Sequence, residues 1–464
     1  MSTANSAAPA GRNPLLTGAV LPTLLKLAAP NVMAMTTAVL VGIAETYYIG
    51  TLGTAPLAAM AVVFPFNMLT QMMSNGAMGG GVSSSVSRAL GAGSIERAAE
   101  SAAHAAVIGL VAGLVYSLLL LLFGPALYAL LGARGDVLAL ATGYATVLFS
   151  GAWLIWLFST LSSILRGTGN MAVPSATILI TSFLQIVLGG ALGLGLAGLP
   201  RLGMPGVAIG QLIAQAAGVA FLLWYLMGGR SRVRLRLAGV AYRRERFIDI
   251  LRVGALACLS PVQSVLTVMI FTGLVARLGV EALAGYGIGQ RLEFLLIPIA
   301  FGIGVAAVPM VGMAVGAGNI ARARRVAWTA GAVSALNLGV VGAIVALSPT
   351  LWSRFFSDDP GVLREAASYL VWAGPAFGFF GFGLTLYFAS QGAGKVLGPV
   401  LAATLRLMLV ALVGTWLAGH GAPAAHYFAL VGAAMFIYGL STMAAVYFTP
   451  WGPQTSGAPR PRAA

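Results

Sequence analysis

Four ionisable side chains lie well inside long apolar segments of this 464-residue sequence: Glu45, Arg291, Glu293 and Arg406. An ionisable group in apolar surroundings is costly and indicates a function or a dedicated partner. Burial favours the neutral form of Glu45, which is the property that proton exchange needs. Pro30, 15 residues earlier, removes a helical hydrogen bond and permits a bend, so protonation of Glu45 is predicted to change how its helix packs. The alternative is an interfacial carboxylate that reaches water.

The other three charges form a second candidate group in the C-terminal half of the chain. Arg291 and Glu293 are two positions apart, so they point to nearly opposite faces of a helix and are not expected to pair. Glu293 and Arg406 remain open to two interpretations. They form a buried ion pair that fixes helix packing, or Glu293 is a second protonatable or cation-binding group.

Other reactive residue types show no pattern typical of an enzyme. His104, His420 and His426 lack metal-ligand spacing, and the single Cys258 excludes an intramolecular disulfide. The glycine-rich run 76–81 has no Walker lysine, so we interpret it as close helix packing. The sequence therefore predicts no catalytic residues, no cofactor and no resident metal.

Seven aromatic and methionine side chains have a pattern typical of an adaptable cavity, although ordinary helix packing is the favoured interpretation. These residues are Phe64, Phe66, Met68, Met72, Met73, Phe294 and Tyr387.

Composition identifies the elements that position these residues as membrane helices. The chain is 59% hydrophobic and only 8% charged, far below the roughly 25% charged residues of soluble domains. About 20 apolar residues cross a bilayer as a helix, and twelve such segments are predicted. They lie near 22–49, 55–79, 101–124, 137–160, 173–195, 204–227, 251–276, 283–311, 327–347, 364–388, 397–418 and 426–448.

The distribution of Lys and Arg predicts the orientation of these helices. The net charge is +15, and most basic residues fall in loops on the side of the two termini. The positive-inside rule places both termini in the cytoplasm and favours a topogenic role over nucleic-acid binding. The predicted parts are a cytoplasmic segment 1–20, a lobe 21–228, a basic connector 229–248, a lobe 249–449 and a flexible tail 450–464.

The two halves of the chain resemble each other at a nearly constant shift. Gly91-Ala92-Gly93 matches Gly316-Ala317-Gly318, and Pro174 matches Pro399, both at 225 residues. Six helices per repeat bring the second copy into the membrane from the same side as the first. The predicted fold is an all-α polytopic membrane protein with twelve transmembrane helices in two six-helix lobes, related by a pseudo-two-fold axis along the membrane normal.

The motifs resemble those of the multidrug and toxic compound extrusion (MATE) family from about residue 20 to 448. They include Pro30 with the segment 45–53, the loops at 91–98 and 316–323, and the segment 166–170. The segment 287–293, together with Arg406, resembles the DinF-like branch of the family. The resemblance implies an exporter of cationic or amphipathic compounds that exchanges them for protons or sodium ions.

The resemblance also implies a cation-coupling site made by Glu45, Gln185 and Gln211. Where the DinF-like branch has a second carboxylate, this sequence has Gly189. Sodium prefers several hard oxygen ligands, so a site with one carboxylate favours protons, with sodium as the less favoured ion.

The expected protein is a proton-coupled efflux transporter of the inner membrane that works by alternating access between its two lobes. Its expected partners are the lipid bilayer and a small cationic or amphipathic substrate, with no nucleic acid, and we expect a monomer. The alternative is a flippase for lipid-linked saccharides or envelope precursors from a related superfamily branch. Such flippases more often have a cationic cleft, whereas this chain offers chiefly Arg291 and Arg406 for one.

Overall fold

The computed structural model describes residues 14–452 and contains helices but no strand in that range. Most of the predicted segments 1–20 and 450–464 falls outside the described residues. The first lobe comprises α1 (Pro14–Thr17), α2 (Val20–Gly50), α3 (Thr54–Gln71), the π-helix η1 (Met72–Met78), α4 (Gly79–Gly91), α5 (Ile95–Leu130), α6 (Gly135–Ser150), α7 (Ala152–Gly167), α8 (Ala172–Leu194), the 3₁₀-helix η2 (Leu196–Gly198) and α9 (Gly203–Met227).

The second lobe follows, and its helices are interrupted at other positions. It comprises α10 (Arg244–Ala257), α11 (Leu259–Ala276), α12 (Val280–Gly316), α13 (Ile320–Leu347), α14 (Thr350–Ser353), α15 (Pro360–Ala373), the 3₁₀-helix η3 (Gly374–Ala376), α16 (Phe377–Gly392), α17 (Leu397–Gly419) and α18 (Ala424–Phe448). The stretch between α9 and α10 is not helical, and its Val233 and Leu235 side chains are buried. The predicted boundaries of the lobes and the connector stay predictions.

Within residues 14–452, eleven helical segments are long and apolar enough to cross a membrane. A twelfth arises when α6 and α7, bent by 42° relative to each other, are counted as one span. The predicted all-α fold with twelve spans is therefore confirmed. The bend follows Ser150, where Gly151 separates two helices of 16 residues each, both too short to cross a bilayer alone.

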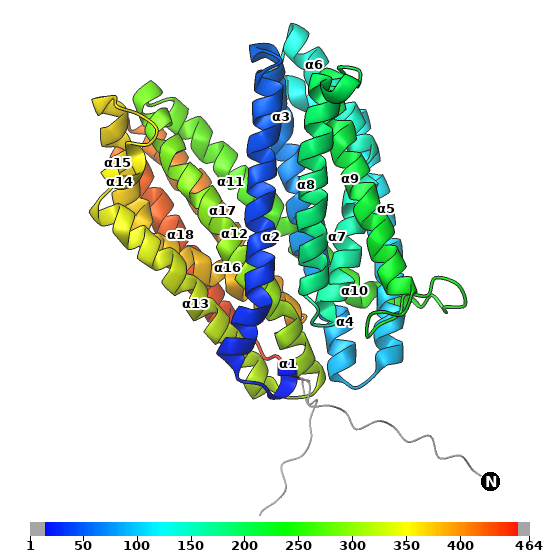
Figure 1. The fold of residues 1–464 in the computed structure, drawn as a ribbon. Helices are drawn as coiled ribbons and strands as arrows, with labels where there is room; N and C mark the ends of the chain where they lie inside the picture. Colours follow the sequence, from blue (N-terminus) through cyan, green and yellow to red (C-terminus); the bar gives the residue numbers. More distant parts are fainter. Residues whose placement is uncertain (1–13, 453–464) are drawn as a thin grey trace, which may run out of the picture.

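The lobes lie side by side, with α2 between them, and they spread apart toward the end where α6 and α15 lie (Figure 1). At the opposite end, Arg322 donates to the carbonyl of Leu15 at 2.9 Å. Arg324 donates to the carbonyl of Thr449 at 3.0 Å. Both ends of the described chain therefore lie at the same end of the bundle, as an even number of spans requires.

The internal repeat is visible in the backbone. Gly93 and Gly318 both have positive φ, 78° and 75°, in the turns that precede α5 and α13. The next residues, Ser94 and Asn319, cap these helices by accepting from the N–H groups of Arg97 and Arg322 at 3.2 and 3.0 Å. The repeated sequence therefore builds the same turn twice.

One close approach between the lobes is also a repeated contact. A Cβ at Gly91 of α4 would lie 2.7 Å from the Cα of Met313, and one at Gly316 of α12 would lie 3.0 Å from the Cα of Arg88. Residues 88 and 91 correspond to 313 and 316 in the repeat, so the two helices cross at equivalent points. Glycine is required because backbone stands where a side chain would be.

Candidate functional site

Glu45 lies in the C-terminal half of α2, where the helix packs along α8. Its side chain is 5% exposed, and Gln185 of α8 donates from Nε2 to its Oε1 at 2.7 Å. The amide N–H stabilises the charged form, while burial favours the neutral form. The structure thus brings two of the three predicted coupling residues into direct contact.

Glycines set the position of α8 relative to α9. A Cβ at Gly210 would lie 2.5 Å from the backbone N of Gly189, so the two helices touch through their backbones. Gln211 follows on α9 and is 2% exposed. Among the described residues, its Oε1 has no hydrogen-bond partner, and no hydrogen bond joins it to Glu45 or Gln185.

Helix α2 is continuous through Pro30, and it contacts both lobes. Beside Pro30, Asn31 donates from Nδ2 to the carbonyl of Gly302 in α12 at 3.2 Å. Leu24 and Ala28 belong to a cluster with second-lobe residues, whereas Ile49 packs within the first lobe. A change at Glu45 therefore acts on a helix whose other half is bound to the opposite lobe.

A cavity of about 340 Å³ lies mostly in the second lobe and is closed on one side by the first. Helices α11, α12 and α15 to α18 form most of its wall, and α3 and η1 contribute the rest. Its lining is predominantly apolar and aromatic, which is typical of sites for drug-sized molecules. Of the seven aromatic and methionine residues singled out in the sequence, Phe64, Met68, Met72, Phe294 and Tyr387 line this cavity.

The remaining two of those seven residues pack elsewhere in the first lobe. Phe66 packs edge-on against Tyr128, and Met73 packs against buried core residues. Five of the seven thus line the cavity, and one of them, Tyr387, also belongs to a core cluster, so the interpretation as ordinary helix packing stays a prediction.

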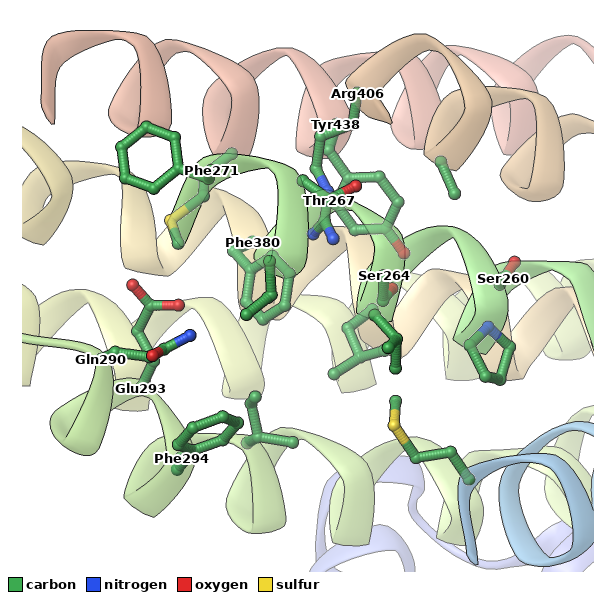
Figure 2. A pocket seen from close by; sticks show the side chains of 18 of the residues that line it. Ser260, Ser264, Thr267, Phe271, Gln290, Glu293, Phe294, Phe380, Arg406 and Tyr438 are labelled. Carbon is green, nitrogen blue, oxygen red and sulfur yellow. The ribbon is translucent and has the colours of Figure 1, made fainter. Parts of the chain in front are cut away.

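The cavity also holds two of the buried charges, Glu293 from α12 and Arg406 from α17 (Figure 2). The hydroxyl of Tyr369 donates to the Glu293 carboxylate. Arg406 lies over the rings of Phe380 and Tyr438, at 5.5 and 5.3 Å from their centroids. Among the described residues, neither charge takes part in a salt bridge.

Arg291, grouped with these two residues on sequence grounds, lies elsewhere. Its side chain is exposed on α12, and its guanidinium stands 5.1 Å from the ring centroid of Phe356. The side chains of Arg291 and Glu293 thus project from different faces of α12, as their spacing predicts. No group of three or more His, Cys, Asp or Glu side chains within the described range gathers in a way that would hold a metal ion.

Comparison with known proteins decides the family. The sequence model of the MatE family matches residues 30–190 and 257–417, one stretch in each half of the chain. The chain belongs to the MatE family. MatE proteins are transporters, so the resemblance to the extrusion family and the prediction of a non-enzyme are confirmed. Placement in the DinF-like branch stays a prediction.

Relatives of this MatE protein cover most of its length. The FAD transporter of Shewanella oneidensis is 25% identical over 86% of this chain and 88% of its own. The probable multidrug resistance protein NorM of Thermotoga maritima is 26% identical over 85% and 83%. A MOP superfamily transporter of Pyrococcus furiosus shares the fold with a TM-score of 0.85, at 22% identity over 94% of this chain and 97% of that one. The two six-helix lobes are thus those of the MatE fold.

One buried charge of this MatE protein was missed from the sequence. Arg166, which begins the motif segment 166–170, is 2% exposed at the end of α7 and donates to Oδ1 of Asn75 in η1 at 2.5 Å. Gly79 and Gly81, just beyond the π-helix, lie directly against Ser163 and Gly254, which confirms that the glycine run 76–81 serves close packing. The π-helix itself carries no signal in the sequence that would have revealed this contact.

Proposed function

We propose that this chain is a secondary active exporter of cationic or amphipathic small molecules, driven by proton exchange and working by alternating access. The observation that carries the proposal is the cavity in the second lobe, because it combines aromatic walls with a partly buried carboxylate, Glu293. Aromatic rings and a carboxylate together favour organic cations. The name of the Thermotoga relative, a probable multidrug resistance protein, supports the same substrate class.

Proton coupling is proposed to occur at Glu45, away from the cavity. Gln185 presents an N–H donor to the carboxylate, whereas a sodium ion would need the amide oxygen there. With one carboxylate and one amide donor in contact, uptake of a proton neutralises the site without further ligands. Gln211 stays a proposed third member of this site, and sodium stays the less favoured coupling ion.

Alternating access is proposed to use α2 as the link between the lobes. Its inner half is bound to α12 through Asn31, and its outer half is bound to α8 through Glu45. About 22 Å of helix separates Pro30 from Glu45, from a rise of about 1.5 Å per residue. Loss of charge at Glu45 would weaken the outer contact, and Pro30 gives the helix a place to bend.

Orientation and localisation complete the proposal. The end of the bundle that holds both chain ends also carries Arg88, Arg97, Arg322 and Arg324, so we place it in the cytoplasm by the positive-inside rule. The protein is then a monomer of the inner membrane with the spread ends of its lobes outside. Tagging both termini and assaying their accessibility tests the orientation, and an external C-terminus would overturn it.

A flippase for lipid-linked saccharides is not favoured by the cavity. Saccharides are bound through many hydrogen bonds, whereas this cavity is lined mostly by apolar side chains and contains one guanidinium. The Shewanella relative is named an FAD transporter, and FAD carries a diphosphate with two negative charges. The single cation of the cavity, Arg406, fits a singly charged group better than a diphosphate.

Transport by the purified protein in liposomes tests the proposal. A fluorescent organic cation is loaded, and a proton gradient or a sodium gradient of equal size is imposed. Dye movement that follows the proton gradient alone is expected. Movement that follows sodium alone would overturn proton coupling, and no movement under either gradient would overturn the proposed substrate class.

A further inference from the structure

Arg406 is a buried cation that forms no salt bridge within the described residues. Its side chain is 9% exposed, and its Nε has no hydrogen-bond partner among the described residues. No carboxylate in the described part of the chain forms a salt bridge with it. Leaving a buried charge unpaired costs several kcal/mol as an order of magnitude. Helix packing alone therefore does not explain why the Arg406 guanidinium is buried without a salt bridge.

Glu293 lines the same cavity but forms no salt bridge with Arg406. Its carboxylate is engaged by the Tyr369 hydroxyl. Figure 2 shows Glu293 beside Gln290 and Phe294, while Arg406 stands with Tyr438 and Thr267 on another part of the wall. The cavity therefore presents two opposite charges to its contents rather than one neutral pair.

The surroundings of Arg406 fix its guanidinium for a ligand. The rings of Phe380 and Tyr438 are neighbours, with centroids 5.8 Å apart, and the guanidinium lies beside both, at 5.5 and 5.3 Å from them. The guanidinium itself is planar and presents its N–H groups as a fork. Such a fork matches the two oxygens of a carboxylate. Phe271 and Phe294 add flat apolar surface to the same cavity, which has the volume of a drug-sized site.

We infer that this cavity binds amphipathic aromatic zwitterions, with the ligand's carboxylate on Arg406 and its cationic group toward Glu293. The inference rests on the proposed function and narrows its substrate class from organic cations to molecules that also carry one carboxylate. A purely cationic ligand leaves Arg406 unpaired, so it forgoes the most favourable polar contact that the cavity offers.

A pair of dyes that differ by one methyl group provides the test. Rhodamine 110 carries a free carboxylate, and rhodamine 123 is its methyl ester. Binding of each dye to the purified full-length protein is measured by fluorescence anisotropy. Wild-type protein is expected to bind the free acid more tightly, by about tenfold, because a hydrogen bond to a charged group is involved. Arg406→Gln is expected to remove that preference, and Arg406→Lys to retain part of it.

The control variant is Arg291→Gln, because Arg291 is exposed on another face of α12 and does not line the cavity. It should leave the ratio of the two affinities unchanged. Tighter wild-type binding of the ester, or an unchanged ratio in Arg406→Gln, would overturn the inference while leaving the proposed exporter in place. Failure of wild-type protein to bind either dye would instead count against both. If Arg406→Gln does not fold, the ratio of the two dye affinities in wild-type protein and in Arg406→Lys still tests the inference.

Discussion

Each of the two lobes has one carboxyl group on a long helix, Glu45 buried and Glu293 partly buried, and the surroundings of the two groups differ. Glu45 of α2 is bound by an amide inside the first lobe. Glu293 of α12 is bound by a tyrosine hydroxyl and faces the cavity. Under the proposed mechanism, this difference places the coupling ion in the first lobe and the substrate in the second.

The backbone of the two lobes is more alike than the residues around their carboxyl groups. The glycine turns before α5 and α13 and the crossing of α4 and α12 are equivalent in both halves. Of the residues that bind the carboxyls, Gln185 corresponds by the shift of 225 to Val410, whereas Tyr369 corresponds to another tyrosine, Tyr144. The backbone features are thus kept in both lobes, while Gln185, which binds Glu45, has an apolar counterpart.

The largest effect is expected from Glu45→Gln. The amide is close in shape to the carboxylic acid and is tolerated by burial, so folding should be retained. Without a titratable group, proton-driven dye transport should fall by at least about a hundredfold, whereas dye–dye exchange at equal pH should persist. Initial rates in liposomes under both conditions provide the measurement.

The matched control for this variant is Glu96→Gln, which changes an exposed glutamate in the first turn of α5. It should transport like wild type. Normal proton-driven transport by Glu45→Gln would remove Glu45 from the mechanism and break the proposed division between the lobes.

Glu293→Gln should have a smaller and different effect. It removes a charge from the cavity and leaves Glu45 in place, so the KM for a cationic dye should rise by about tenfold, from a charged contact of about 1.5 kcal/mol. Since the titratable Glu45 remains, transport should keep its dependence on the proton gradient. Rates measured against dye concentration at two pH gradients separate these outcomes. Loss of dependence on the proton gradient with an unchanged KM would mean that Glu293, and not Glu45, couples transport to protons.

Sequence alone could predict the helices and the repeat, because both depend on local composition and on spacing. Twelve apolar segments and a constant shift of 225 residues are visible without contacts. The contact of Glu45 with Gln185 depended on family resemblance, since 140 residues separate the two.

The rest of the site could not be predicted, for physical reasons. Whether Glu293 pairs with Arg406 depends on the angle at which α12 and α17 meet the cavity, which no pattern in either helix specifies. Arg166 ends an apolar segment like a loop residue, yet it is buried because the π-helix brings Asn75 to it. Apolar residues that line a cavity and those that fill a core have the same sequence pattern, so Phe64 and Phe66 could not be distinguished.

Gly91→Ala and Gly316→Ala test whether the equivalent glycines of the α4–α12 crossing contribute equally to its stability. Each new Cβ would collide with backbone across the α4–α12 crossing, and overpacking of this kind costs about 1–3 kcal/mol. The conformation with this end closed should become less populated by about fivefold or more. Spin labels at Arg97 and Arg325, in a Cys258→Ser background, should report longer distances.

The control for these two variants is Gly419→Ala, at a position with open space around the new Cβ. It should leave the distance distribution as in wild type. If Gly91→Ala and Gly316→Ala shift the distribution to different extents, the crossing is equivalent in geometry but not in energy.

The smallest effects are expected from Gly93→Ala and Gly318→Ala, and they compare the lobes most directly. Both glycines have positive φ, and a Cβ at either would meet nothing within 4 Å. The cost is therefore that of the backbone conformation alone, about 1–2 kcal/mol, and it should be equal at the two positions. Thermal unfolding in detergent should show two similar decreases of about 1–3 °C. Gly42→Ala, within α2 and equally open, should shift the midpoint upward instead, because alanine is the better helix residue. Unequal decreases at 93 and 318 would mean that one lobe unfolds before the other, and the variant with the larger decrease would identify which.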